Sequence, residues 1–161
     1  MPTARIRAHN AKIYGIDWAH ARASDIVTCS LDKSIKVWNV NEATSTENFQ
    51  PEPLTTITTH YPVWRARDLP FGRGVLSLPQ RGETSLGMWA EDNPLTPAVV
   101  FEGHTDVVKE FVWRKGGTGV FTQLSVFAYS VSLQMVQSIN LLPGRRIGHS
   151  VSGLYPQRLW R

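Results

Sequence analysis

The chain has 161 residues, of which 42% are hydrophobic and 10% aromatic, a composition that suits one domain with a buried core and excludes a disordered protein. Its single cysteine, Cys29, excludes an internal disulfide and any cysteine-based zinc site, so we expect a reducing compartment, either the cytosol or the nucleus. Residues 1–117 hold 13 basic and 13 acidic side chains, and the net charge of +4 comes from four scattered arginines after them, a pattern that does not favour a nucleic-acid partner.

Alternating apolar and polar residues predict three strands near the N-terminus. The segments are KIYGIDW (12–18), DIVTCS (25–30) and SIKVW (34–38). All three are rich in β-branched residues, and turn-forming residues separate them at 23–25 and 31–33. These features predict a first β unit over about residues 5–40.

Tryptophans suggest that this unit repeats. Trp18, Trp64 and Trp113 are 46 and 49 residues apart, and Trp38 and Trp89 are 51 apart. A period of about 45 to 50 residues is typical of propeller blades. We therefore predict blades over about residues 5–40, 55–92 and 99–117, which together form a domain over residues 1–117.

Two segments within this domain are predicted to be exposed loops. The segment NEATSTENFQPEPL, at 41–54, follows the first unit and is rich in Pro, Thr and Asn. The segment AEDNPLTPA, at 90–98, follows the second unit, which lacks an Asp before its Trp. Surface loops of this kind are where a repeat protein would bind partners, but a solvated linker is the favoured interpretation of both segments.

Residues 118–161 depart from the pattern, because they contain no Asp, Glu or Lys and lose the repeat. Our hypothesis is that this tail is foreign to the domain, arising from a retained intron, a frameshift or a misjudged gene end. The alternative is a divergent blade in which VFTQLSVFAYSVSLQMV still forms strands. Polar residues interrupt the uncharged stretch from 118 to 144, so no membrane span is predicted.

Residues 7–40 resemble one WD40 repeat, with AH in place of the usual Gly-His and WN in place of Trp-Asp. EGH at 102–104 matches the start of another repeat through Gly103 and His104, and Trp89 marks the repeat between them. The resemblance implies an all-β fold, an incomplete β-propeller of two WD40-type blades and part of a third with an atypical C-terminal tail. A WD40 propeller usually has about seven blades, so an open array of this size should leave apolar surface exposed.

The resemblance also implies a structural hydrogen-bonded set of four side chains, His9, Thr28, Asp32 and Trp38. A turn carboxylate can accept an imidazole N–H while the other ring nitrogen accepts from a hydroxyl. The indole N–H supplies one more donor at a buried position. Asp32 is therefore expected to hold a turn in place.

The rival interpretation is a catalytic triad of Thr28, His9 and Asp32. No nucleophile elbow or oxyanion-hole glycine loop accompanies these residues. The five histidines, namely His9, His20, His60, His104 and His149, lack metal-ligand spacing. We predict no catalytic, cofactor-binding or metal-binding residues and no enzyme activity.

Four further stretches point to one particular family of WD40-repeat proteins. AKIYGIDW, YPVWRARDLPFGRG, LPQRGETSL and FEGHTDVVKEFVWR together are similar to the propeller of the WD-repeat subunit of the Seh1-associated (SEA, or GATOR-type) complex, over about residues 3–117. The resemblance implies a scaffold that binds other subunits of a complex that regulates TOR signalling in response to amino acids. It implies a cytoplasmic protein, peripheral to the vacuolar or lysosomal membrane through the complex. That family's RWD and RING-type parts are not matched by this sequence.

Two other interpretations stay open at this point. One is a truncated product without independent function. The other is a WD-repeat protein associated with nucleic acid or chromatin, for which the tail arginines would be needed.

Overall fold

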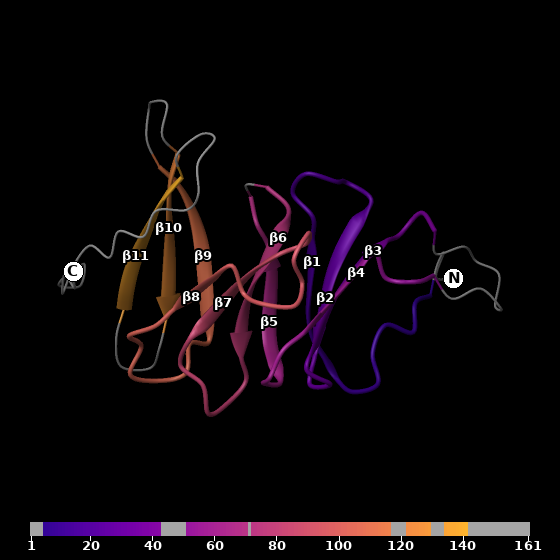
Figure 1. The fold of residues 1–161 in the computed structure, drawn as a ribbon, viewed down its shortest axis with the longest axis horizontal. Coiled ribbons are helices and arrows are strands. Elements are labelled where there is room, and N and C mark those ends of the chain that lie inside the picture. The colour runs from indigo at the N-terminus through magenta and orange to yellow at the C-terminus, as the bar shows by residue number, and fades with distance from the viewer. Residues whose placement is uncertain (1–4, 43–50, 71, 117–121, 130–133, 142–161) are drawn as a thin grey trace, which may run out of the picture. The chain divides into compact units, whose positions relative to one another are not determined.

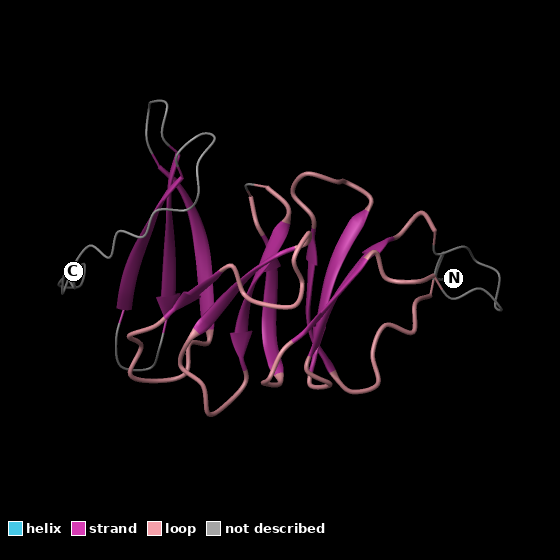
Figure 2. Cartoon of the chain, viewed as in Figure 1, coloured by secondary structure: helices cyan, strands magenta, loops and turns pink. Residues whose placement is uncertain are grey.

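The computed structural model of the chain describes residues 5–42, 51–70, 72–116, 122–129 and 134–141. Within these ranges the regular secondary structure is all strand (Figure 2), so they include no helix that could cross a membrane. The chain divides into two compact units, Met1–Gly103 and His104–Arg161. The predicted all-β fold is confirmed, and the first unit holds two four-stranded antiparallel sheets of the kind expected for propeller blades.

The first sheet has the order β1-β2-β3-β4, with every neighbouring pair antiparallel. Its strands are β1 (Ile13–Trp18), β2 (Asp25–Ser30), β3 (Ser34–Asn39) and β4 (Thr55–Thr58) (Figure 1). The first three confirm the strands predicted from alternation. Lys33, with a φ of 65°, closes the turn between β2 and β3.

The second sheet repeats this topology in the order β5-β6-β7-β8. Its strands are β5 (Val63–Asp68), β6 (Gly74–Pro79), β7 (Leu86–Ala90) and β8 (Val99–Phe101). Even the irregularities recur, because the register shifts between Ile13 and Gly15 in β1 and between Val63 and Arg65 in β5. The two sheets are therefore copies of one unit with an offset of about 50 residues.

The offset between the two sheets shows that only one of the two tryptophan series marks the structural repeat. Trp38 lies opposite Ile26 and Trp89 opposite Val75, so these two tryptophans occupy equivalent places. Trp18, in contrast, ends β1, whereas Trp64 is the second residue of β5 and corresponds to Tyr14. The rings of Tyr14 and Trp64 lie 4.8 Å apart between centroids. The 46-residue spacing of Trp18 and Trp64 is therefore not the structural repeat.

The sheet boundaries also differ from the predicted blade ranges. The ranges 55–92 and 99–117 each begin with a strand, β4 or β8, that pairs with the preceding sheet. The reason is physical: the outer edges of β3 and β7 carry backbone groups that need partners. Ile57 of β4 is also fully buried in the core beside the first sheet. The last strand of each sheet, β4 or β8, therefore comes after the linker that follows the third strand of that sheet.

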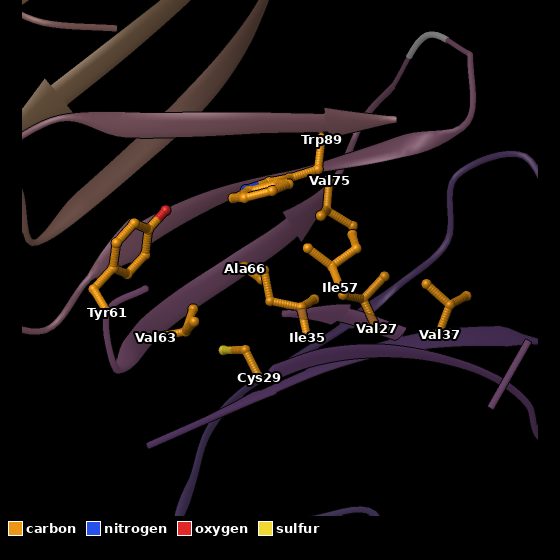
Figure 3. Close-up of a cluster of buried hydrophobic side chains, with 10 residues drawn as sticks. All are labelled: Val27, Cys29, Ile35, Val37, Ile57, Tyr61, Val63, Ala66, Val75 and Trp89. Atoms are coloured by element: carbon orange, nitrogen blue, oxygen red, sulfur yellow. The ribbon is translucent and has the colours of Figure 1, made fainter. Parts of the chain in front are cut away.

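The main core lies between the two sheets of the first unit (Figure 3). Alternate residues of the strands point into it, which explains the period of two in the sequence. Burying one such aliphatic side chain stabilises the fold by roughly 1.5 to 3 kcal/mol. The cluster consists of Val27, Cys29, Ile35, Val37 and Ile57 from the first sheet with Tyr61, Val63, Ala66, Val75 and Trp89 from the second part of the unit.

The second unit contains a three-stranded antiparallel sheet in the order β11-β10-β9. Its strands are β9 (Glu110–Gly116), β10 (Thr122–Tyr129) and β11 (Gln134–Leu141). β9 pairs with β10 along seven residue pairs, so the unit boundary falls at Gly103/His104 and not at the predicted 117/118. These strands are what the divergent-blade alternative predicts for the tail. A foreign origin of residues 118–161 stays a prediction, and 118–121, 130–133 and 142–161 lie outside the described residues.

Candidate functional site

The four side chains His9, Thr28, Asp32 and Trp38 lie together on the first sheet. The His9 ring, which is fully buried, has its Nδ1 3.1 Å from Asp32 Oδ2 and its Nε2 2.8 Å from Thr28 Oγ1. The Trp38 indole N–H donates to Thr28 Oγ1 at 2.9 Å. The chain thus runs from a turn carboxylate through an imidazole and a hydroxyl to a buried indole.

This network assigns the imidazole proton. A carboxylate only accepts, so Nδ1–H donates to Asp32, and Nε2 is left to accept the Thr28 O–H. Burial lowers the pKa of His9 below its usual value and outweighs the nearby Asp32 carboxylate, which acts to raise it. His9 is therefore a neutral imidazole at neutral pH.

Asp32 is held by more donors than the sequence revealed. The backbone N–H of Ser34 donates at 3.1 Å and its hydroxyl at 2.6 Å, both to Oδ1, and the Asn10 backbone N–H donates to Oδ2 at 3.0 Å. Burial alone would raise the pKa of Asp32, but the donors Ser34, Asn10 and His9 lower it overall. The Asp-x-Ser spacing is the sequence signal for this turn.

Lys36 also attaches the residues before β1 to the β2–β3 hairpin. Its Nζ donates to the Ala8 carbonyl at 2.8 Å and lies 5.6 Å from the centre of the Trp38 ring. The backbone N–H of Leu31 donates to the Lys12 carbonyl at 3.1 Å. The residues before β1 are therefore attached to the β2–β3 hairpin at several points.

The second sheet holds its own buried set, which sequence reasoning missed. The Trp89 indole N–H donates to Ser77 Oγ at 2.8 Å, and the Tyr61 hydroxyl is 2.8 Å from the same Oγ. Ser77 and Trp89 correspond to Thr28 and Trp38, and Tyr61 takes the place of His9. The tyrosine contacts the serine directly and Ser77 also donates to the Gly87 carbonyl at 3.1 Å.

Tyrosine explains why the second unit lacks the aspartate. An imidazole has a second nitrogen whose buried N–H needs an acceptor, whereas a phenol has one oxygen and no such group. Burial raises the pKa of Tyr61, so its hydroxyl stays protonated. The missing Asp is therefore a consequence of the exchange of His for Tyr.

Glycine at position 87 makes room for this second set. A Cβ added to Gly87 would lie 2.9 Å from Trp89 Nε1 and 3.1 Å from the Tyr61 hydroxyl oxygen. The equivalent position in the first sheet is Lys36, which pairs with Thr28 as Gly87 pairs with Ser77. A signal was available in the sequence, since SLGMW replaces SIKVW at the same place.

Polar contacts also join the two sheets. The His20 backbone N–H donates to the Oδ2 of buried Asp68 at 2.6 Å, and the His20 Nδ1 is 3.1 Å from the same oxygen. Arg22, in the turn before β2, binds Asp25 at the start of β2 with its Nε at 2.7 Å and Glu91, directly after β7, with its Nη2. The turn between β1 and β2 thereby fixes the ends of β5 and β7.

The remaining candidates do not gather into a site. Gly103 has a φ of 101°, and His104, at the start of the second unit, is buried, which lowers its pKa. His60 is exposed and lies edge-on to Tyr61, whereas His149 lies outside the described residues. Burial raises the pKa of Cys29 to about 12. The described part of the chain contains no group of three His, Cys, Asp or Glu residues able to hold a metal ion.

The geometry of the first set favours a structural role over a nucleophilic one. Thr28 is 3% exposed, and its oxygen already accepts the indole N–H of Trp38. A nucleophile needs a lone pair that an approaching substrate can reach. The set can orient a turn and a tryptophan, and its hydroxyl is buried away from solvent.

Known proteins share this repeat. The family model described as WD domain, G-beta repeat, matches residues 1–39. GATOR2 complex protein Wdr59 of Drosophila melanogaster is 39% identical over 117 residues, covering 70% of this chain and 11% of its own. GATOR2 complex protein WDR59 of Homo sapiens is 38% identical over 117 residues, covering 71% and 11%.

An RWD, RING finger and WD repeat-containing protein of Schizosaccharomyces pombe is 41% identical over 123 residues, covering 74% of this chain and 9% of its own. The chain spans about a tenth of the length of these three relatives. Its four-stranded sheets, its buried tryptophan sets and these matches agree. The chain is a WD40-repeat protein that forms an incomplete set of propeller blades and is homologous, over much of its length, to the proteins named GATOR2 complex protein WDR59.

Proposed function

We propose that this chain is part of a non-enzymatic scaffold that binds other protein subunits in a GATOR2-type complex. The observation that carries the proposal is the likeness to GATOR2 complex proteins over about 70% of the chain. The buried polar sets support it, since their reactive side chains hold the buried tryptophan of each blade in place. Binding is then left to exposed loops and strand edges.

The finer part of the proposal follows the family resemblance. The complex would correspond to the SEA or GATOR-type assembly that regulates TOR signalling in response to amino acids. The chain would lie in the cytoplasm and reach the vacuolar or lysosomal membrane through its partner subunits.

One exposed loop is a specific candidate for the binding surface. Residues 91–98 follow β7, and Leu95 in this loop is 84% exposed. The loop starts with a tight turn, because the Asn93 backbone N–H donates to the Ala90 carbonyl at 3.2 Å. A leucine held out on an ordered turn suits a partner pocket better than a solvated linker does.

The test is co-purification from cells of an organism that has a GATOR2-type complex. The tagged chain is expected to recover other subunits of the GATOR2-type complex above a tag-only control, and Leu95→Ser to reduce the recovery several-fold. Leu54→Ser, at another exposed leucine that is 46% exposed, is the matched control. Recovery no higher than the tag alone, from a chain shown to be folded by circular dichroism, would refute the scaffold proposal. Equal recovery with Leu95→Ser would refute only the loop.

A further inference from the structure

The segment Arg5–Lys12, here called the N-terminal strap, lies on the first sheet without forming a strand (Figure 1). Its attachments include the His9 ring in the buried set, the Asn10 N–H on Asp32, the Ala8 carbonyl on Lys36 and the Lys12 carbonyl on the Leu31 N–H. Ala8 is 6% exposed and the His9 side chain is fully buried, so the strap covers part of the hairpin. Three of the four attachments use an ionisable side chain.

The charged groups that face His9 come from one hairpin. Asp32, in the turn after β2, accepts the Nδ1–H, and Lys36, on β3, acts on His9 through its charge. Ser34 and Thr28 supply the neutral partners, at 3.0 Å from Nδ1 and 2.8 Å from Nε2. The environment of the ring is therefore one carboxylate, one ammonium and two hydroxyls.

Protonation of His9 disturbs this arrangement in a defined way. The proton must go to Nε2, which then becomes a donor and can no longer accept the Thr28 O–H. Thr28 Oγ1 would face two donors, the imidazolium and the Trp38 indole, and its own O–H would have only the Lys36 carbonyl at 3.4 Å. The added charge would also be buried.

The buried set of the second sheet contains no group that protonation would disturb in this way. It is built from Tyr61, Ser77 and Trp89, none of which takes up a proton in mild acid. The segment before β5 is attached through the Tyr61 hydroxyl and through its backbone, with the Gln80 N–H donating to the Pro62 carbonyl at 2.9 Å. Its histidine, His60, lies 3.7 Å from Glu83, but both side chains are exposed and neither belongs to the buried set. One molecule thus holds a proton-sensitive and a proton-insensitive version of the same attachment.

We infer that the N-terminal strap is an acid-sensitive latch, which leaves the first sheet in mild acid and uncovers Trp38 while the second sheet keeps its own set closed. The trigger is proton uptake by His9, followed at lower pH by Asp32. Lys36 then loses the Ala8 carbonyl, and the Asn10 N–H loses its acceptor.

The pH range in which the N-terminal strap is released follows from the lowered pKa values of His9 and Asp32. His9 has a lowered pKa in the folded chain, so the closed state loses stability as the pH falls below 6.5, the ordinary value, toward the lowered one. Asp32 also has a lowered pKa, so its contribution is complete above 3.8 and is lost as the pH falls through the lowered value. Both effects favour release in acid.

The experiment is hydrogen exchange by NMR on the whole chain, following the indole N–H of Trp38 and of Trp89 from pH 7.5 to 4.5. After correction for intrinsic rates, protection of the Trp38 indole should fall by about tenfold per pH unit between the open and closed pKa values of His9. Protection of the Trp89 indole should stay constant. The Asn10 amide should follow Trp38.

Two variants complete the test. His9→Gln keeps an amide that can donate to Asp32 and accept from Thr28, and it should remove the pH dependence above pH 5. His20→Gln, at an exposed histidine outside the set, should leave it unchanged. Parallel loss of protection at both indoles, or constant protection at Trp38 throughout, would overturn the latch. A pH response that persists in His9→Gln would do the same.

Discussion

Both sheets of the first unit hold a buried tryptophan through hydrogen bonds, but they do so with different side chains. The first fixes its tryptophan through a threonine, a neutral histidine and an ionised aspartate, and the second through a serine and a tyrosine. The shared part is a hydroxyl that accepts an indole N–H. What differs is how many further polar groups must be satisfied, and this number follows from whether the next ring is an imidazole or a phenol.

Removal of the buried tryptophan of either sheet should lower the free energy of unfolding the most. Trp38→Ala is expected to lower the free energy of unfolding by about 3 to 5 kcal/mol, because it leaves a cavity and removes the indole N–H that donates to Thr28 Oγ1. Urea unfolding followed by circular dichroism measures the loss. Trp18→Ala is the control, since Trp18 is 59% exposed, and should cost less than about 1 kcal/mol. Equal losses would show that Trp38 is not a core residue.

Removal of Asp32 should affect the first sheet alone. Asp32→Ala deprives the His9 Nδ1–H, the Ser34 groups and the Asn10 N–H of their acceptor and should cost about 2 to 4 kcal/mol by urea unfolding. Asp92→Ala, at an exposed carboxylate after β7, serves as the control and should be nearly neutral. A neutral Asp32→Ala would mean that His9 needs no acceptor, and our explanation of the second sheet would fail.

A side chain at position 87 should disturb the second sheet. Gly87→Ala pushes a methyl group toward Trp89 Nε1 and the Tyr61 hydroxyl and should cost about 1 to 3 kcal/mol by urea unfolding. In a Tyr61→Phe background the same change should cost less, because the hydroxyl that it meets is gone. Additive effects would place Tyr61 outside this cluster.

Loss of the Tyr61 hydroxyl should have the smallest effect. Tyr61→Phe is expected to cost about 1 kcal/mol in urea unfolding, because Ser77 keeps the Trp89 indole and the Gly87 carbonyl as partners. His60→Ala, at the exposed neighbour, should change stability by less than half of that. A loss as large as that of Asp32→Ala would mean that the second sheet depends on the Tyr61 hydroxyl as strongly as the first depends on the Asp32 carboxylate.

Local signals in the sequence were enough to predict three of the four strands of the first sheet. The alternation in residues 12–38 gave three strands, and the four members of the first set were named because residue types and separations matched a WD40 repeat. Tyr61 was missed because a change of residue type hid its role, while its neighbour His60 has the expected type and is exposed. β4 and β8 were given to the wrong blades because their pairing depends on contacts across a linker. The spacing of Trp18 and Trp64 gave a wrong period because Trp18, an exposed residue at the end of β1, has the same residue type as Trp64, whose ring lies against Tyr14.

The protonation state of the His9 ring tests the central claim most directly. Nitrogen chemical shifts of the imidazole, measured by NMR at pH 7 on the whole chain, distinguish the two neutral tautomers from the imidazolium. The account predicts a neutral ring with its proton on Nδ1, donating to Asp32, and a bare Nε2 that accepts from Thr28. A proton on Nε2, alone or together with one on Nδ1, would contradict it.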